Sequence, residues 1–118
     1  MATPKRIVVN EQDGVSVVRF VDRKIVDSSS IEQLGEELIA LVTVDKRNML
    51  LLNFENVEFL SSAALNKLIS LRNKIKPTGG TLKLCNLHKD IEQVFKITKL
   101  DKLIEILPNE EKGLASFK

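Results

Sequence analysis

The sequence predicts an α/β fold in which a mostly parallel sheet of four to five strands packs against about four helices. Strand-like runs alternate with segments of helical periodicity along the chain, which is typical of parallel strands joined by helical crossovers. Residues 49–52 are continuously apolar, as in a strand that is covered on both faces. A length of 118 residues suits one hydrophobic core, and no repeat or linker interrupts the chain, so we expect a single domain over 1–118.

The first elements that we predict are a hairpin and a helix. Runs rich in β-branched residues over 7–9 and 15–21 flank a turn signal over 10–14. Asp27 to Ser30 offer several N-cap residues, and Ser29 with Glu32 matches a capping box, which marks a helix start. Apolar residues then recur at helical spacing and carry this helix to about Val42: Ile31, Leu34, Leu38 and Leu41.

A second helix is predicted after the apolar strand. It begins near Ser61 or Ser62 and ends at Pro77 and the paired Gly79-Gly80. Its buried stripe is expected to comprise Ala64, Leu65, Leu68, Ile69, Leu71 and Ile75. Its solvent-facing side is expected to comprise Asn66, Lys67, Ser70, Asn73 and Lys74.

Four shorter elements complete the pattern. We predict strands over 81–85 and 103–107, a helix over 89–98 and a terminal helix over 109–117. The residues of the third helix that are expected to face inward are Ile91, Val94 and Phe95.

Composition excludes several classes of function. The net charge is only +2, from 18 basic and 16 acidic residues, and the chain has five Phe but no Trp or Tyr for base stacking, so no nucleic-acid partner is expected. No apolar run approaches the ~20 residues of a membrane-spanning helix, so we expect no direct membrane insertion and a cytoplasmic location. The single cysteine, Cys85, rules out an internal disulfide.

Enzyme signatures are scarce. The chain has no glycine-rich phosphate loop and no Gly-x-Ser-x-Gly nucleophile elbow. Cys85 and His88 supply two ligands where a structural zinc site needs four, and Cys85 is interpreted as a small hydrophobic residue at a strand end. We therefore expect no catalytic residue, no metal and no cofactor. A hydrolase that uses Ser62 and His88 is the alternative from the enzyme class, but its acid partner and oxyanion hole are unassigned.

The adjacent serines Ser61 and Ser62 stand at the predicted start of the second helix. One interpretation is that one of them is an N-cap, worth ~1 kcal/mol. The other is that one of them carries a phosphate, because unpaired N–H groups and a partial positive charge at a helix N-terminus tolerate a dianion. A phosphate there would change the surface that a partner meets while leaving the fold intact.

Three segments resemble the STAS domain family, whose members include sulphate-transporter tails and anti-sigma factor antagonists of bacteria. They are Val57-Glu-Phe-Leu-Ser-Ser-Ala-Ala-Leu65, Gly79-Gly-Thr-Leu-Lys-Leu-Cys-Asn-Leu87, and the stretch from Val94 to Leu100 followed by 103–106. The resemblance covers nearly the entire chain and implies a STAS-like fold.

For function, the resemblance implies an anti-sigma factor antagonist that works by partner switching. The family's Asp-Ser-Ser/Thr-Gly motif falls on residues 60–63, which makes Ser62 the implied phosphorylation site and Ser61 the second choice. The implied partners are an anti-sigma factor that is itself a serine-protein kinase and a PP2C-type serine phosphatase. The implied partner-binding residues are Glu58, Leu60, Ser61, Ser62 and Asn66.

Two positions depart from the family motif: Leu60 replaces its acidic residue and Ala63 replaces its glycine. The Leu60 departure removes a charge beside the acceptor and favours the first alternative function, a STAS scaffold subunit of a signalling complex. The second alternative is a cytosolic accessory subunit of a membrane transporter.

Overall fold

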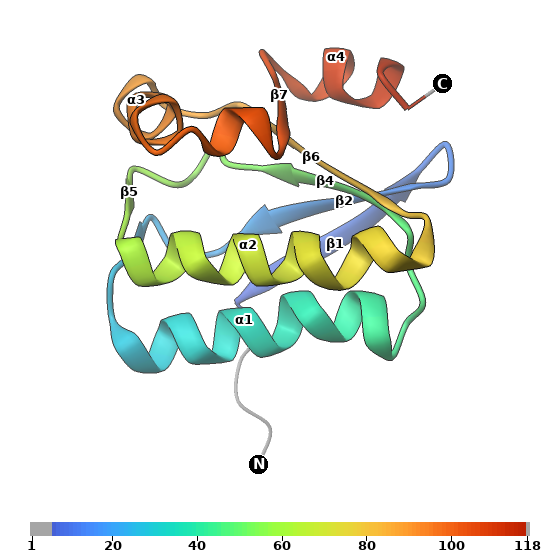
Figure 1. The fold of residues 1–118 in the computed structure, drawn as a ribbon, viewed down its shortest axis with the longest axis horizontal. Helices are drawn as coiled ribbons and strands as arrows, with labels where there is room; N and C mark the ends of the chain where they lie inside the picture. The colour runs from blue at the N-terminus through green and yellow to red at the C-terminus, as the bar shows by residue number, and fades with distance from the viewer. Residues whose placement is uncertain (1–5, 118) are drawn as a thin grey trace.

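The computed structural model describes residues 6–117 and confirms the α/β prediction (Figure 1). Five strands form one mixed sheet in the order β1-β2-β4-β6-β7. Only β1 and β2 pair antiparallel, and the remaining neighbours pair parallel. The strand bounds are β1 Ile7–Gln12, β2 Val15–Phe20, β4 Met49–Asn53, β6 Thr81–Cys85 and β7 Glu105–Leu107.

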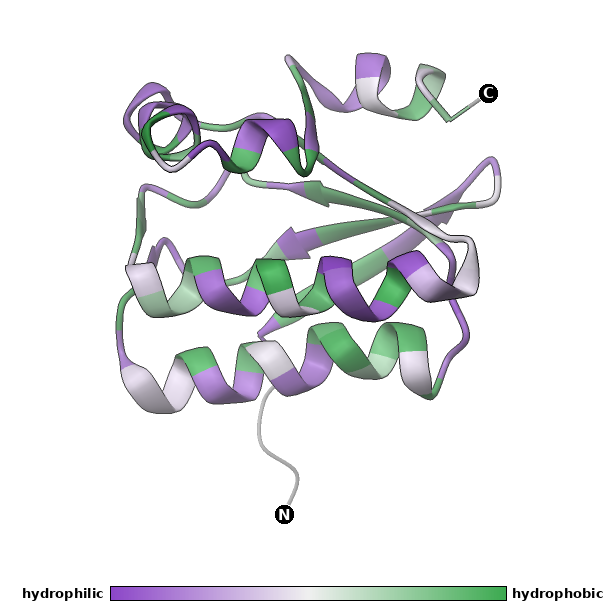
Figure 2. Cartoon of the chain, viewed as in Figure 1, coloured by the Kyte–Doolittle hydropathy of each residue, from purple (hydrophilic) through white to green (hydrophobic). Residues whose placement is uncertain are grey.

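Helices cover both faces of this sheet. Helices α1 (Ser28–Thr43) and α2 (Ser62–Ile75) lie side by side on one face, and α4 (Glu110–Ala115) lies on the other (Figure 1). Helix α3 (Lys89–Ile97) follows β6. Apolar and polar segments alternate along α1 and α2, as expected for helices with one buried face (Figure 2). These elements agree with the predicted order and differ from the predicted bounds mostly by one or two residues.

The hairpin is longer than predicted. Residues 10–12 were expected in the turn, but they extend β1 and pair with residues 15–17 of β2. The turn itself is Asp13-Gly14, with φ of 53° and 82°, the positive values that a two-residue type I′ hairpin turn requires. Because β1 is an edge strand with one exposed face, it tolerates polar side chains. Its last three residues therefore lack the apolar pattern that indicates a strand.

The start of α1 corrects the capping-box prediction. Asp27, not Ser29, is the N-cap, and one of its carboxylate oxygens accepts a hydrogen bond from the Ser30 N–H at 3.2 Å. The Ser29 hydroxyl also donates to this carboxylate, and that bond, followed by the one from Ser30, lowers the pKa of Asp27. An ionised carboxylate is a better acceptor than a hydroxyl, so the helix begins at the earlier cap.

The inward face of α3 is narrower than predicted. Ile91 and Phe95 are buried in the main core, but Val94 is 37% exposed, so its assignment to the inward face was wrong. Ile91 and Phe95 are four residues apart and therefore lie on the same face of the helix. Helix α3 contacts the core through this face, and Val94 lies beside it. The last strand is also shorter than predicted, because the N–H groups of Leu103 and Ile104 donate to the Leu100 carbonyl and continue the preceding 3₁₀ turn.

A second, smaller core lies between the sheet and α4. It contains Val15, Val17, Leu51 and Cys85, with Leu114 and Phe117 packed against it. Both ends of the C-terminal segment are fixed to the sheet by polar contacts. Glu110 pairs with Arg19 and accepts a hydrogen bond from Asn53 Nδ2 at 3.0 Å, while the buried ammonium of Lys83 donates to the Ser116 carbonyl at 2.9 Å.

Cys85 gives a pH-dependent test of this packing. Burial, and next the negative charge of Glu110, raise the pKa of its thiol to about 12. In the unfolded chain a thiol ionises from about pH 8.5. The unfolded state therefore loses a proton first, and the free energy of unfolding should fall as the pH rises from about 8.5 towards 12.

We expect Cys85 in the native protein to react with a disulfide reagent at pH 8 far more slowly than in urea. The Cys85→Ala variant should show a weaker loss of stability in the alkaline range. Equal reaction rates in buffer and in urea would contradict the burial of this side chain.

Candidate functional site

The candidate site lies at the end of the sheet where α1 and α2 both begin. Two short strands that the sequence analysis missed, β3 (Lys24–Ile25) and β5 (Phe59–Leu60), pair in parallel there and hold the segments that lead into the two helices. Helices α1 and α2 start at the same side of the molecule (Figure 1). This arrangement places two helix N-termini, with their unpaired N–H groups, in one region of the surface.

Ser61 is the N-cap of α2. Its backbone is extended (φ −78°, ψ 166°), and its hydroxyl oxygen accepts a hydrogen bond from the Ala64 N–H at 3.3 Å. Its own N–H donates to the Ile25 carbonyl at 3.0 Å, which ties the start of α2 to β3. Ser61 is half-buried and its side chain serves the helix.

Ser62 is the first residue of α2 and differs from Ser61 in its exposure and in its hydrogen bonding. It is exposed, and its hydroxyl makes no hydrogen bond within residues 6–117. Asn66 lies one turn further along the same face and is also exposed. The geometry thus divides the two serines into a helix cap and a hydroxyl that is available to solvent.

This division predicts different costs of substitution. Ser61→Ala should lower the free energy of unfolding by about 1 kcal/mol, because the Ala64 N–H loses its cap. Ser62→Ala should change it little, and Ser62→Asp should be neutral or slightly stabilising, since an acid at a helix start is favourable. Urea unfolding of the three variants measures this, and a cost at Ser62 as large as that at Ser61 would contradict the assignment.

The two remaining residues of the predicted partner surface lie just before the serines. Leu60 is half-buried and packs against the main core. The exposed carboxylate of Glu58 pairs with the side chain of Arg23 at 2.9 Å, and its N–H donates to the Arg23 carbonyl at 2.7 Å. Glu58 is therefore held beside β3 by its contacts with Arg23.

Two exposed apolar side chains of this region are not evident from the sequence. Phe59 is 54% exposed and Val26 is 56% exposed, and the ammonium of Lys24 lies 5.4 Å from the centroid of the Phe59 ring. Exposed aromatic side chains of this kind are enriched at protein–protein interfaces. The exposure of Phe59 follows from its place in β5, and a strand of two residues is too short to show periodicity in the sequence.

The residues of the enzyme alternative are placed differently. His88 Nε2 lies 2.6 Å from the Glu55 carbonyl oxygen, so this nitrogen is a donor, and no hydrogen bond joins His88 to Ser62 in the described part of the chain. Over residues 6–117, no three His, Cys, Asp or Glu side chains gather in a group that could hold a metal ion. None of the helices in this range is long and apolar enough to cross a membrane.

Comparison with known proteins agrees with this architecture. The STAS domain model matches residues 6–113. A putative anti-sigma factor antagonist, BtrV of Bordetella bronchiseptica, is 26% identical over 113 residues, which are 96% of this chain and 95% of that protein.

Solved structures share the fold as well. An anti-sigma-factor antagonist (STAS) domain protein from Planctomyces limnophilus has a TM-score of 0.85 at 21% identity, covering 98% of this chain and all of that one. The Bacillus cell fate determinant SpoIIAA in its phosphorylated form has a TM-score of 0.72 at 16% identity, covering 95% of this chain and 99% of that one. The chain belongs to the STAS domain family and is similar to its anti-sigma factor antagonists.

Proposed function

We propose that the chain is an anti-sigma factor antagonist whose binding to its partner is controlled by phosphorylation of Ser62. The observation that carries the proposal is the exposed, unbonded hydroxyl of Ser62 beside a cap that Ser61 already supplies. A kinase can reach Ser62 without disturbing α2, and the helix N-terminus accommodates the added charge. The similarity to BtrV and to a relative described in a phosphorylated form supports the same interpretation.

The surface that meets the partner is proposed to be centred on the start of α2. We define this partner face as Lys24, Val26, Phe59, Ser62 and Asn66. The exposed apolar groups of Phe59 and Val26 supply contact area, while Ser62 and Asn66 supply polar groups within the same region. A phosphate on Ser62 carries a charge of about −1.5 to −2. Removing it from water in such an interface would cost free energy and weaken the binding of the partner.

In this cycle the chemistry belongs to the partners. The unphosphorylated chain binds an anti-sigma factor that is also a serine kinase, and the sigma factor is released. The kinase then phosphorylates Ser62 and the complex dissociates. A PP2C-type phosphatase hydrolyses the phosphate and restores the first state. This chain is a ligand and a substrate and supplies no catalytic group.

The test compares Ser62→Ala and Ser62→Asp as baits in lysate of the source organism. We expect the alanine bait to retain a serine kinase, identified by mass spectrometry, and the aspartate bait to lose it. Asn73→Asp, which adds the same charge at an exposed site near the far end of α2, is the matched control and should retain the kinase.

A second arm follows the covalent step. The captured kinase with ATP should transfer one phosphate to the wild-type chain and to Ser61→Ala but none to Ser62→Ala. If the alanine and aspartate baits recover the same proteins, Ser62 is not the switch. The identity of those proteins would then choose between a scaffold subunit and an accessory subunit of a transporter.

A further inference from the structure

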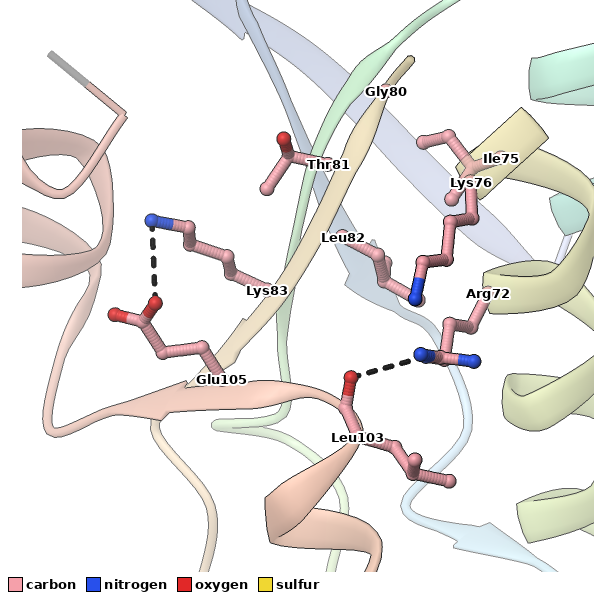
Figure 3. Close-up of a pocket in the computed structure, with 9 residues that line it drawn as sticks. All are labelled: Arg72, Ile75, Lys76, Gly80, Thr81, Leu82, Lys83, Leu103 and Glu105. Atoms are coloured by element: carbon pink, nitrogen blue, oxygen red, sulfur yellow. Dashed lines mark hydrogen bonds and ion pairs between the residues drawn. The ribbon is translucent and has the colours of Figure 1, made fainter. Parts of the chain in front are cut away.

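A basic cleft lies at the opposite end of α2 from Ser62. It is bounded by the last turns of α2, the start of β6 and the segment that leads into β7, and its volume is ≈ 250 Å³ (Figure 3). Arg72 and Lys76 of the cleft lie 10 and 14 positions beyond Ser62, which at ~1.5 Å per residue is a separation of about 15–20 Å. The cleft is therefore distinct from the partner face.

The cleft exists because β7 is shorter than β6. Strand β7 pairs only with residues 83–85, so Thr81 and Leu82 extend beyond it. The Leu103 carbonyl, two residues before β7, accepts a hydrogen bond from Arg72 Nε at 3.1 Å and does not extend the pairing of β6 with β7 (Figure 3). The side chain of Arg72 thus takes the place of a strand N–H as the donor to the Leu103 carbonyl.

Strand pairing also directs a backbone donor towards this opening. In a parallel strand, alternate residues direct their N–H and C=O groups to opposite neighbours. The Thr81 N–H donates to the Asn48 carbonyl at 2.7 Å, on the β4 side. The N–H of Leu82 consequently faces the side on which β7 is absent.

Two positive charges in the cleft lack a counter-charge. Arg72 and Lys76 are one turn apart on α2 and its 3₁₀ extension, and neither forms an ion pair with a carboxylate within residues 6–117. The third cation, Lys83, is neutralised by Glu105 at 3.5 Å (Figure 3). The apolar side chains of Ile75, Leu82 and Leu103 also line the cleft.

We infer that this cleft binds a small oxyanion of charge −2, of the phosphate-monoester class. Within the described residues, Arg72 Nε donates to the Leu103 carbonyl and Nη1 donates to Asn73 Oδ1 at 3.4 Å, which leaves Nη2 to donate to an oxyanion. Lys76 supplies the second positive charge, and the Leu82 N–H supplies a neutral donor. A dianion matches the two unpaired cations. The size of the cleft fits a phosphate group with a few attached atoms and not an extended cofactor.

The test is a titration of the ¹⁵N-labelled protein with inorganic phosphate, followed by two-dimensional NMR at constant ionic strength. We expect the amide signals of residues 80–82 and 103 to shift with saturation, and chloride to leave them unchanged. A second titration with glycerol 3-phosphate distinguishes the two sources of the dianion. Tighter binding of the ester assigns the site to a phosphorylated metabolite, and equal binding assigns it to the phosphate group alone.

Variants localise the site. Lys76→Gln should weaken phosphate binding by about tenfold or more, in line with the loss of one charge-assisted hydrogen bond. Arg72→Gln/Lys76→Gln should abolish it. Lys74→Gln removes the same charge from an exposed position of α2 outside the cleft and should bind as the wild type does, as should Ser62→Ala. Because Arg72 also holds Leu103, folding of the double variant is checked by circular dichroism.

Two outcomes would overturn the inference: saturating shifts that persist in Lys76→Gln at unchanged affinity, or an absence of phosphate-specific shifts at residues 80–82 and 103 in the wild type. Neither result depends on the kinase partner, so failure here and failure of the switch at Ser62 are distinguishable.

Discussion

The Leu68→Asp variant is expected to be unfolded at room temperature. Leu68 is 2% exposed and lies on the face of α2 that packs into the main core. The substitution removes a buried side chain, at a cost of about 2–5 kcal/mol, and adds an unpaired buried charge. A domain of this size has a free energy of unfolding of about 5–15 kcal/mol, so the loss approaches the whole of it.

Circular dichroism and thermal unfolding measure this effect, with Asn66→Asp as the control. Asn66 is exposed on the same helix, and its replacement adds the same charge without burial, so the control should melt within a few degrees of the wild type. A cooperative transition of Leu68→Asp near the wild-type temperature would mean that the inner face of α2 has been assigned incorrectly.

Gly80→Ala should be the second most damaging of the substitutions considered. A Cβ atom at this position would lie 2.6 Å from Ile75 Cγ1 and 2.7 Å from the Asn48 carbonyl oxygen. The second of these atoms is backbone, and the Asn48 carbonyl already accepts the Thr81 N–H that begins β6. Relief of the clash must shift the β4–β6 pairing, and we expect a loss of about 3 kcal/mol.

Its neighbour provides the comparison. Gly79 has a φ of 79°, but no atom lies within 4 Å of a Cβ placed there. Gly79→Ala should therefore cost only the strain of a left-handed backbone, about 1 kcal/mol. Chemical unfolding of both variants separates a steric requirement from a conformational one. The same cost at both positions would show that the contact with Asn48 relaxes freely.

The elements that the sequence predicted well are those with a long periodic pattern. The stripe of α2 was predicted from spacing alone, and Ala64, Leu65, Leu68, Leu71 and Ile75 are buried while Ile69 packs partly against the core. The apolar run of β4 was likewise a reliable sign of a strand with neighbours on both sides. In these segments burial of each residue follows from its position in one regular element.

The parts that were missed depend on contacts between distant segments. The β3–β5 pair consists of two residues in each strand and exists because the segments before α1 and α2 run side by side. Lys67 was assigned to the solvent-facing side, yet its side chain lies against Gly35 of α1 and its ammonium pairs with Glu32 at 3.1 Å. Periodicity describes one element at a time and carries no information on these neighbours.

The same distinction holds for the candidate site: its position was evident from the sequence, and the roles of its residues depend on contacts between distant segments. A serine at the start of α2 was evident from the sequence, but the roles of Ser61 and Ser62 depend on one backbone hydrogen bond to Ile25 and on one cap. The exposed Phe59 and the pairing of Glu58 with Arg23 also depend on the position of β3.

The hairpin has a consequence for how the chain reaches its fold. Strands β1 and β2 are joined by two residues, whereas Ser16 pairs with Leu50 and Met49 with Thr81, across separations of roughly 30 residues. Each parallel pair requires a long loop to close, and the chain entropy lost in this closure must be spent before the contacts of the pair can compensate for it. We therefore expect the hairpin, closed by the turn at Asp13-Gly14, to form before the parallel pairs. A substitution at Gly14 that disfavours a positive φ should then slow refolding more than it accelerates unfolding.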